Sequence, residues 1–386
     1  MPAVIVGPAS AALGISRAAV LGAFSGAIVI SGICAPRMGR FVDRHGGRGL
    51  LAASTIVLAG GLALLAAAHG PVLWYAGWGV LGIGMGIGLY DAAFATAGRL
   101  LGAAAAPTIT GITLVAGFAS TVFWPLGVAL VGALGWRGTL AVYAALHLAA
   151  NLPMLLWLVP KAGSGPPPPG PPPNAAHAGG GARLVRAAPR SMLVWLSGFF
   201  TLRWLITSAI AVYVLQLFQG LGLTPREAVL AASLIGPGQV LGRILEWSVG
   251  KRVPLLARAR LGAALFPAGA LMLLAGGPVA AICFALLYGM SNGIMTIHRG
   301  TLPLALFGAA GYAARIGWLA LPVQFAQAAA PTLAAPVVAA LSARQGFALA
   351  ATLGAVAFFL LLPLRLATHR GEIAHAAPGP EPPHDR

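Results

Sequence analysis

The sequence RMGRFVDRHGGR (Arg37–Arg48) decides the fold of this chain. It carries four of the chain's 24 basic residues and one of its seven acidic residues, yet it lies between two long apolar runs, 18–35 and 49–68. Charged side chains are costly inside a bilayer, and the short cytoplasmic loops of membrane proteins are rich in Lys and Arg. The segment therefore predicts a tight cytoplasmic turn between two membrane helices.

The composition of the whole chain agrees with this prediction. Of 386 residues, 59% are hydrophobic and only 8% are charged, and the mean hydropathy is +0.88. Soluble domains are about 45–50% apolar. Backbone polar groups must be satisfied inside lipid, and the apolar runs have the length of helices and not of barrel strands. We therefore expect an all-α membrane protein.

The apolar runs predict 12 spans, the first of which is incomplete. Complete spans are predicted at approximately 18–38, 50–68, 72–97, 108–133, 139–159, 191–217, 226–247, 259–275, 279–298, 316–340 and 347–366. Residues 1–13 are also apolar, but 13 helical residues reach only about 20 Å. We expect them to form the second half of a helix that starts before Met1.

A segment rich in Pro and Gly divides the predicted spans into two sets of six. This segment, 161–190, predicts an extended cytoplasmic linker between an N-terminal six-helix bundle at 1–160 and a C-terminal six-helix bundle at 191–367. The tail at 368–386 is polar and contains three His and four Pro. Its composition predicts a disordered cytoplasmic tail.

The basic residues fix the orientation of the predicted spans. If the turn at 37–48 lies inside the cell, 19 Lys and Arg fall on the cytoplasmic side and four fall outside. This bias follows the positive-inside rule and supports both the span count and the orientation. The net charge of +17 therefore belongs to loops at the membrane surface. We expect no nucleic-acid partner, and we expect a monomer.

The charged turn has a second copy in the chain. A shift of 203 positions places Gly39, Arg40, Asp43, Gly47 and Arg48 on Gly242, Arg243, Glu246, Gly250 and Lys251. A shift of 206 places Gly111 on Gly317 and Pro125 on Pro331, which is a weaker match because Gly and Pro are abundant. The copy differs at Trp247 and Val249, which replace the Arg44 and Gly46 types. The pattern predicts two parallel repeats of six helices.

The pattern of Gly, Asp, Arg and Gly in 39–48 resembles the signature loop between helices 2 and 3 of the major facilitator superfamily of secondary transporters. The resemblance covers nearly the whole chain apart from the linker and the tail. It implies two six-helix halves that rock around a central cavity. It also implies that the loop latches the halves together on the cytoplasmic side in the outward-open state. The latch candidates are Gly39, Asp43, Arg44, Gly47, Arg48, Gly242, Arg243 and Glu246; the alternative is a simple topology anchor. Residues 14–48 also look like bacterial members grouped loosely with monocarboxylate carriers, which implies the bacterial cytoplasmic membrane.

Arg203 is the most unusual charged residue, because it lies near the middle of a predicted span. A charge at that depth costs about 2.5–3.5 kcal/mol on insertion scales and normally faces a cavity or a partner. One interpretation is that Arg203 receives an anionic group of the substrate, such as a carboxylate. The alternatives are a structural pair with Asp91, or a later helix start that lets Arg203 reach the cytoplasmic surface.

Two further sets of polar residues lie at equal depth in the two halves. Tyr90 and Asp91 lie about 20 residues into the fourth span, and His298 and Arg299 lie about 20 residues into the tenth. Asp91 is a candidate proton-coupling carboxylate, with His298 as the alternative. A gate or an ion pair between the halves is the other use of these residues, and both sets could instead reach the cytoplasmic headgroups.

Gln324 and Gln327 fall on one face of the eleventh span and could bind a substrate by hydrogen bonds. Their alternative role is polar contact between helices. Tyr213 is a further candidate for substrate contact, although aromatic side chains more often pack. The alternating glycines of GIGMGIG (82–88) are not followed by Lys and Ser or Thr, so they predict close helix packing and not a phosphate loop.

The sequence contains no ATPase motif, nucleophile elbow or cluster of metal ligands, so we expect neither an enzyme nor a primary pump, and neither a cofactor nor a metal site. The leading hypothesis is a secondary transporter for a small organic anion, with proton coupling as an expectation of the family. Efflux of hydrophobic drugs is one alternative, although the fifth span has only an isolated Trp124–Pro125 in place of a Gly-Pro-rich motif. A membrane receptor or scaffold without transport activity is the other alternative.

Overall fold

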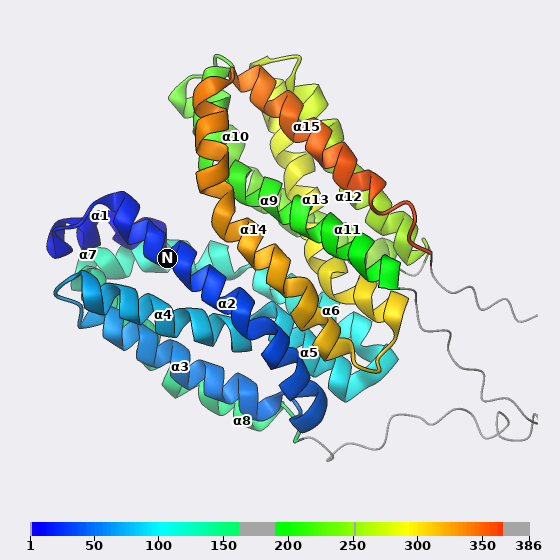
Figure 1. Cartoon of the computed structure of the whole chain (residues 1–386). Coiled ribbons are helices and arrows are strands. Elements are labelled where there is room, and N and C mark those ends of the chain that lie inside the picture. The colour runs from blue at the N-terminus through cyan, green and yellow to red at the C-terminus, as the bar shows by residue number, and fades with distance from the viewer. Residues whose placement is uncertain (1, 162–189, 251, 366–386) are drawn as a thin grey trace, which may run out of the picture.

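The computed structural model describes residues 2–161, 190–250 and 252–365. Within these ranges the chain forms helices joined by short turns and contains no strand. The prediction of an all-α fold is confirmed. The predicted linker and tail, and Lys251 in the second copy of the charged turn, lie outside the described residues (Figure 1).

The N-terminal half consists of eight helices before the linker (Figure 1). They are α1 (Pro2–Leu13), α2 (Arg17–His45), α3 (Arg48–Ala66), α4 (Pro71–Gly88), α5 (Tyr90–Leu101), α6 (Ala105–Gly117), α7 (Ala119–Leu146) and α8 (Leu152–Leu158). Within α7, Gly135 has φ 68° and ψ 175°, so the chain changes direction there. This position separates the two predicted spans 108–133 and 139–159.

The C-terminal half consists of seven helices. They are α9 (Arg190–Gly220), α10 (Pro225–Ser233), α11 (Ile235–Val249), α12 (Leu255–Leu273), α13 (Gly277–Phe307), α14 (Tyr312–Ala340) and α15 (Ala343–Phe359). By length and composition, nine helical segments of the described residues could cross a membrane. Two shorter apolar helices, 4–13 and 343–359, lie where the first and last spans are predicted.

The predicted span at 279–298 ends too early, because α13 continues to Phe307. The predicted span was ended at His298 because the polar residues His298 and Arg299 interrupt the apolar run there. In the structure both side chains are buried against groups of the protein, so lipid does not force the helix to stop there. The span predicted at 72–97 consists of two helices, since the backbone at Leu89 is extended between α4 and α5.

The glycines of GIGMGIG bring α4 into contact with two neighbours. A β-carbon on Gly82 would lie 2.6 Å from the Ala27 carbonyl oxygen, so this face of α4 touches the backbone of α2. Gly84 and Gly88 face α3 instead, and a β-carbon on Gly84 would lie 2.8 Å from Leu58 Cδ2. The prediction of close helix packing is confirmed. The C-terminal half repeats this contact between α11 and α13, where a β-carbon on Gly238 would meet the Leu286 carbonyl oxygen at 2.8 Å.

The two halves meet at one end of the molecule. Figure 1 shows the two sets of helices spreading apart toward α1 and α10 and meeting near α5 and α6. The closest junction is between α2 and α14. A β-carbon on Gly39 would overlap the Ala313 carbonyl group, and one on Gly317 would lie 3.0 Å from the Ala35 carbonyl carbon. Main chain therefore rests on main chain between the halves. We call this region, where α2 ends and α14 begins, the latch end.

We predict that Gly39→Ala lowers the melting temperature of the purified protein, because the added methyl group forces α2 away from the backbone of α14. Gly60→Ala is the matched control. It lies in α3 with open space around it, so the higher helix propensity of Ala should keep or raise the melting temperature. A melting temperature of Gly39→Ala equal to or above that of the control would contradict contact between the two backbones.

Candidate functional site

The first feature of the site is a carboxylate of one half that caps a helix of the other. Helix α14 begins after Gly311, which has a left-handed backbone and no side chain to cap the helix. Asp43, near the end of α2, accepts a hydrogen bond from the Ala314 backbone N–H, with 2.8 Å between Asp43 Oδ2 and the nitrogen. Acidic groups stabilise helix N-termini through such bonds and through the helix dipole. Asp43 therefore supplies α14 with the cap that its own sequence lacks.

The other residues of the charged turn face their own half. Gly47 packs against Thr96 of α5, and Arg48 donates a hydrogen bond to the Leu156 carbonyl oxygen of α8. Arg44 is exposed and makes no hydrogen bond or ion pair with a described residue. Of the turn's predicted latch residues, Gly39 and Asp43 are the two that touch the C-terminal half.

The second copy of the turn is bonded within the C-terminal half. Gly242 of α11 packs against Met290 of α13. Glu246 is 5% exposed, pairs with Arg258, and lies 3.4 Å from His298 Nε2. The sequence assigned both copies to a latch between the halves, but in this structure Gly242 and Glu246 join helices of one half.

An ion pair connects the halves beside the latch end. Arg299 of α13 binds Asp91 of α5 with two hydrogen bonds, at 2.9 Å from Nε to Oδ1 and 2.7 Å from Nη2 to Oδ2. Both side chains are largely buried, and Arg299 also lies over the Trp204 ring at 5.3 Å. Two-point guanidinium–carboxylate contacts are strong and directional. The structure thus brings together two residues that the sequence placed at equal depth.

Arg203 points away from this junction into the C-terminal half. Its guanidinium donates hydrogen bonds to Thr207, Ser291 and Asn292 and lies 5.1 Å from the centre of the Phe266 ring. Only 2% of its surface is exposed. Asp91 is not its partner, and Arg203 does not reach the membrane surface. In this conformation it presents no face to a solute.

Arg243 is the guanidinium that the structure places between the halves without a counter-charge. It is 6% exposed, lies against Gly117 of α6, and is close enough to Tyr90 of α5 to interact with it electrostatically. It makes no hydrogen bond or ion pair with any described residue, and its Nε is buried without a partner. The sequence placed Arg243 among the latch residues between the halves but did not predict that it would lack a counter-charge there.

The carboxylates of the described residues are all bound elsewhere. The described residues contain four carboxylates. Asp43 caps α14, Asp91 binds Arg299, Glu246 binds Arg258, and Glu227 caps its own helix through Thr224. None of them is left to neutralise Arg243.

The remaining candidates have internal roles or no partner in this conformation. Tyr213 donates a hydrogen bond from its hydroxyl to the Pro331 carbonyl oxygen at 3.0 Å and so ties α9 to α14. His298 is fully buried, with its Nδ1 3.3 Å from Thr301 Oγ1. Gln324 and Gln327 are partly buried and make no hydrogen bond with a described residue, so their amides are available for binding.

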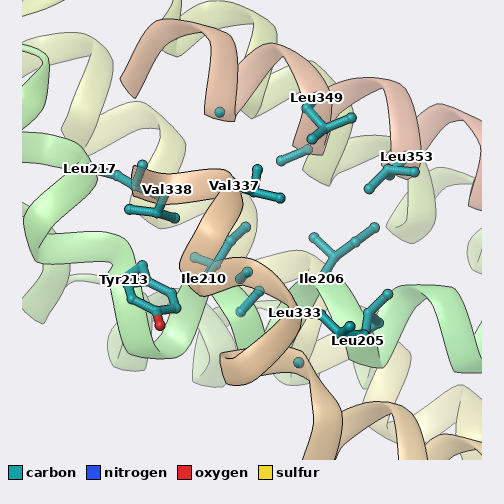
Figure 2. Close-up of a pocket in the computed structure, with 15 residues that line it drawn as sticks. Leu205, Ile206, Ile210, Tyr213, Leu217, Leu333, Val337, Val338, Leu349 and Leu353 are labelled. Carbon is teal, nitrogen blue, oxygen red and sulfur yellow. The ribbon is translucent and has the colours of Figure 1, made fainter. Parts of the chain in front are cut away.

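Two cavities among the described residues differ in their position relative to the halves. One, of about 410 Å³, lies between the halves. It is lined by one residue of α6 and six of α11, namely Gly117, Gly236, Pro237, Gln239, Val240, Leu241 and Ile244. The other, of about 240 Å³, lies inside the C-terminal half among α9, α14 and α15 (Figure 2). Figure 2 shows its wall of Ile206, Ile210, Leu333 and Leu353, in which the Tyr213 hydroxyl is the one labelled polar tip. The first cavity adjoins an uncompensated charge and the second does not.

Comparisons with known proteins agree with the architecture. A sequence model described as Major Facilitator Superfamily matches residues 1–314. No curated protein matches the chain. Among solved structures, the human organic anion transporter MFSD10 (TETRAN) is 17% identical, with a TM-score of 0.64 and coverage of 92% of this chain and 88% of that one.

Two further solved structures share the fold. FucP in the outward conformation is 15% identical, with a TM-score of 0.67 and coverage of 88% and 89%. The proton:xylose symporter XylE, bound to 6-bromo-6-deoxy-D-glucose, is 13% identical, with a TM-score of 0.67 and coverage of 94% and 91%. At these identities the likeness shows the fold alone.

We predict that Asp91 and Arg299 are energetically coupled across the halves. Asp91→Asn and Arg299→Gln should each lower the free energy of unfolding, because each leaves a buried charge without its partner. The loss in the free energy of unfolding of the double variant should be smaller than the sum of the two single losses. The difference, the coupling energy, should be roughly 1–3 kcal/mol in denaturant titrations. Additive losses would show that the two groups do not interact in the membrane protein.

Proposed function

The chain belongs to the major facilitator superfamily of secondary transporters, and we propose that it carries a small organic anion across the membrane by alternating access. It is therefore a transporter and not an enzyme. We choose an anion as the substrate because the Arg243 guanidinium lies between the halves without a counter-charge among the described residues.

The proposed cycle uses the two halves as units, an N-terminal bundle at 1–160 and a C-terminal bundle at 191–367. The excess of Lys and Arg supports a cytoplasmic location for the latch end. Since the halves meet there and spread apart at the other end, this conformation corresponds to the outward-open state. Release of Asp43 from α14, and of Asp91 from Arg299, would then open the cytoplasmic side.

Charge decides the substrate class. An uncompensated guanidinium in a poorly solvated junction repels cations and attracts a carboxylate, which it can bind with two parallel hydrogen bonds. The main alternative is efflux of hydrophobic drugs, and this charge argues against those drugs that are cationic. The printed name of one structural relative, an organic anion transporter, is consistent with the same class. Gln324 and Gln327 are candidates for further substrate contacts, while Arg203 is the alternative anion-binding group.

Proton coupling has a candidate position in this scheme. Protonation of Asp91 would remove the negative partner of Arg299 and weaken the junction between the halves. The buried pair of Glu246 and His298 is the alternative, although it lies within one half. The symporter FucP and the proton:xylose symporter XylE share the fold with this chain, which is consistent with coupling to protons.

We predict that Arg243→Gln abolishes stabilisation by small carboxylates while the melting temperature without ligand changes little, because Arg243 has no bonds in the protein to lose. The dissociation constant should rise at least about tenfold, as expected for loss of a charge-assisted contact. Thermal-shift titrations with acetate, butyrate and succinate provide the measurement.

Arg203→Gln provides the comparison for this prediction. It should lower the melting temperature without ligand, because it leaves three buried hydrogen-bonding groups without their donor. Its ligand-dependent shift should remain. If Arg203→Gln removes the carboxylate response and Arg243→Gln keeps it, Arg203 is the anion-binding group and our assignment is wrong.

A separate prediction concerns the latch. Asp43→Asn keeps an oxygen acceptor but loses the charge that favours the N-terminus of α14. A loss of about 1 kcal/mol would raise the ratio of separated to joined halves about fivefold. Distances between spin labels on Gly49 and Ala310, in a variant without the two cysteines, report this ratio.

Glu227→Gln is the control for the latch experiment, because Glu227 caps a helix through Thr224 of its own half. It should leave the label distances as in the parent protein. Identical distance distributions for Asp43→Asn and Glu227→Gln would remove Asp43 from the latch.

A further inference from the structure

The two flanks of the junction between the halves are built differently. On one flank, glycines bring the backbones of α2 and α14 into direct contact at Gly39 and Gly317. On the other flank, α6 and α11 leave the cavity of about 410 Å³ between them. The first flank is closed by main chain, whereas the second has free space for a ligand.

The wall of this cavity is largely apolar. Val240, Leu241 and Ile244 of α11 line it, and both Leu241 and Ile244 are 44% exposed. On the facing side, Gly117 of α6 contributes no side chain, and the polar Gln239 of α11 also belongs to the lining. Removing exposed apolar side chains from water by contact with a hydrocarbon group is favourable. The cavity is therefore suited to a hydrocarbon group that arrives from the membrane.

One boundary of the same cavity is charged. Gly117, which lines it, has no side chain, and the Arg243 guanidinium occupies the space where its β-carbon would be. This guanidinium has no counter-charge among the described residues and is more than nine-tenths buried. A cavity with a mainly apolar lining, which also includes Gln239, thus adjoins a buried positive charge.

We propose that the cavity between α6 and α11 binds the alkyl tail of an amphiphilic monocarboxylate whose carboxylate pairs with Arg243. This rests on the proposed function and narrows its substrate class from small organic anions to carboxylates with a hydrocarbon chain. The substrate reaches Arg243 from the bilayer, between the two halves. Short and doubly charged carboxylates fill the site poorly, since they leave the apolar wall without a partner.

The experiment measures binding of linear carboxylates of two, four, six and eight carbons to the full chain in nanodiscs. Each methylene transferred to an apolar site is worth about fourfold in the dissociation constant, so affinity should rise by that factor per carbon. Empty nanodiscs correct for partitioning into lipid. Octyltrimethylammonium has a comparable tail with the opposite charge and should not bind.

Leu241→Trp and Leu245→Trp are the matched variants. Leu241 lines the cavity, so a larger side chain there should abolish the gain in affinity with chain length. Leu245 is an exposed residue of the same helix outside the cavity lining, so Leu245→Trp should behave like the parent.

The outcomes separate this inference from the proposed function. If short carboxylates bind through Arg243 but affinity does not rise with chain length, or rises equally in Leu241→Trp, the tail site is refuted and anion transport stands. If Arg243→Gln binds carboxylates as the parent does, both the tail site and the assignment of Arg243 are refuted. If no carboxylate of any length binds, the proposed function itself is refuted.

Discussion

The structure depends on one capped helix end. Helix α14 begins with a glycine that offers no side chain to its free N–H groups, and Asp43 of the other half accepts one of them. A cap of this kind contributes about 0.5–2 kcal/mol, far less than the burial of a helix. The glycines around it matter because Asp43 reaches α14 only if the two backbones touch.

The two copies of the charged turn share residue types but differ in the partners that these residues bind. Both copies keep a glycine, an arginine and an acid at the same spacing. In the first copy the acid caps a helix of the other half, and in the second it binds Arg258 and approaches His298 inside its own half. The halves therefore do not meet symmetrically. Sequence similarity could predict that both acids are bound, but the partners depend on how the halves pack.

The sequence predicted how far along a helix the polar residues lie better than it predicted the side of the helix on which they lie. Asp91 and Arg299 lie at equal depth in related helices, and the structure pairs them. Arg203 lies near the middle of α9, as the sequence places it, but one residue corresponds to about 100° around a helix. As a result Trp204, and not Arg203, faces the junction and packs on Arg299. The end of α13 was missed for a related reason, since a charged residue signals a helix end only if it has no partner within the membrane.

Electrostatics connects the proposed binding group to the proposed motion. A buried guanidinium without a counter-charge is expensive in a medium of low polarity, and bringing further protein around it raises that cost. Arg243 lies between the halves in this position, and every described carboxylate is bound elsewhere. A bound anion would lower the cost of closing the junction around Arg243. A substrate without a negative charge would not lower this free energy. Arg243 can therefore both select the anion and make the change of conformation depend on a bound anion.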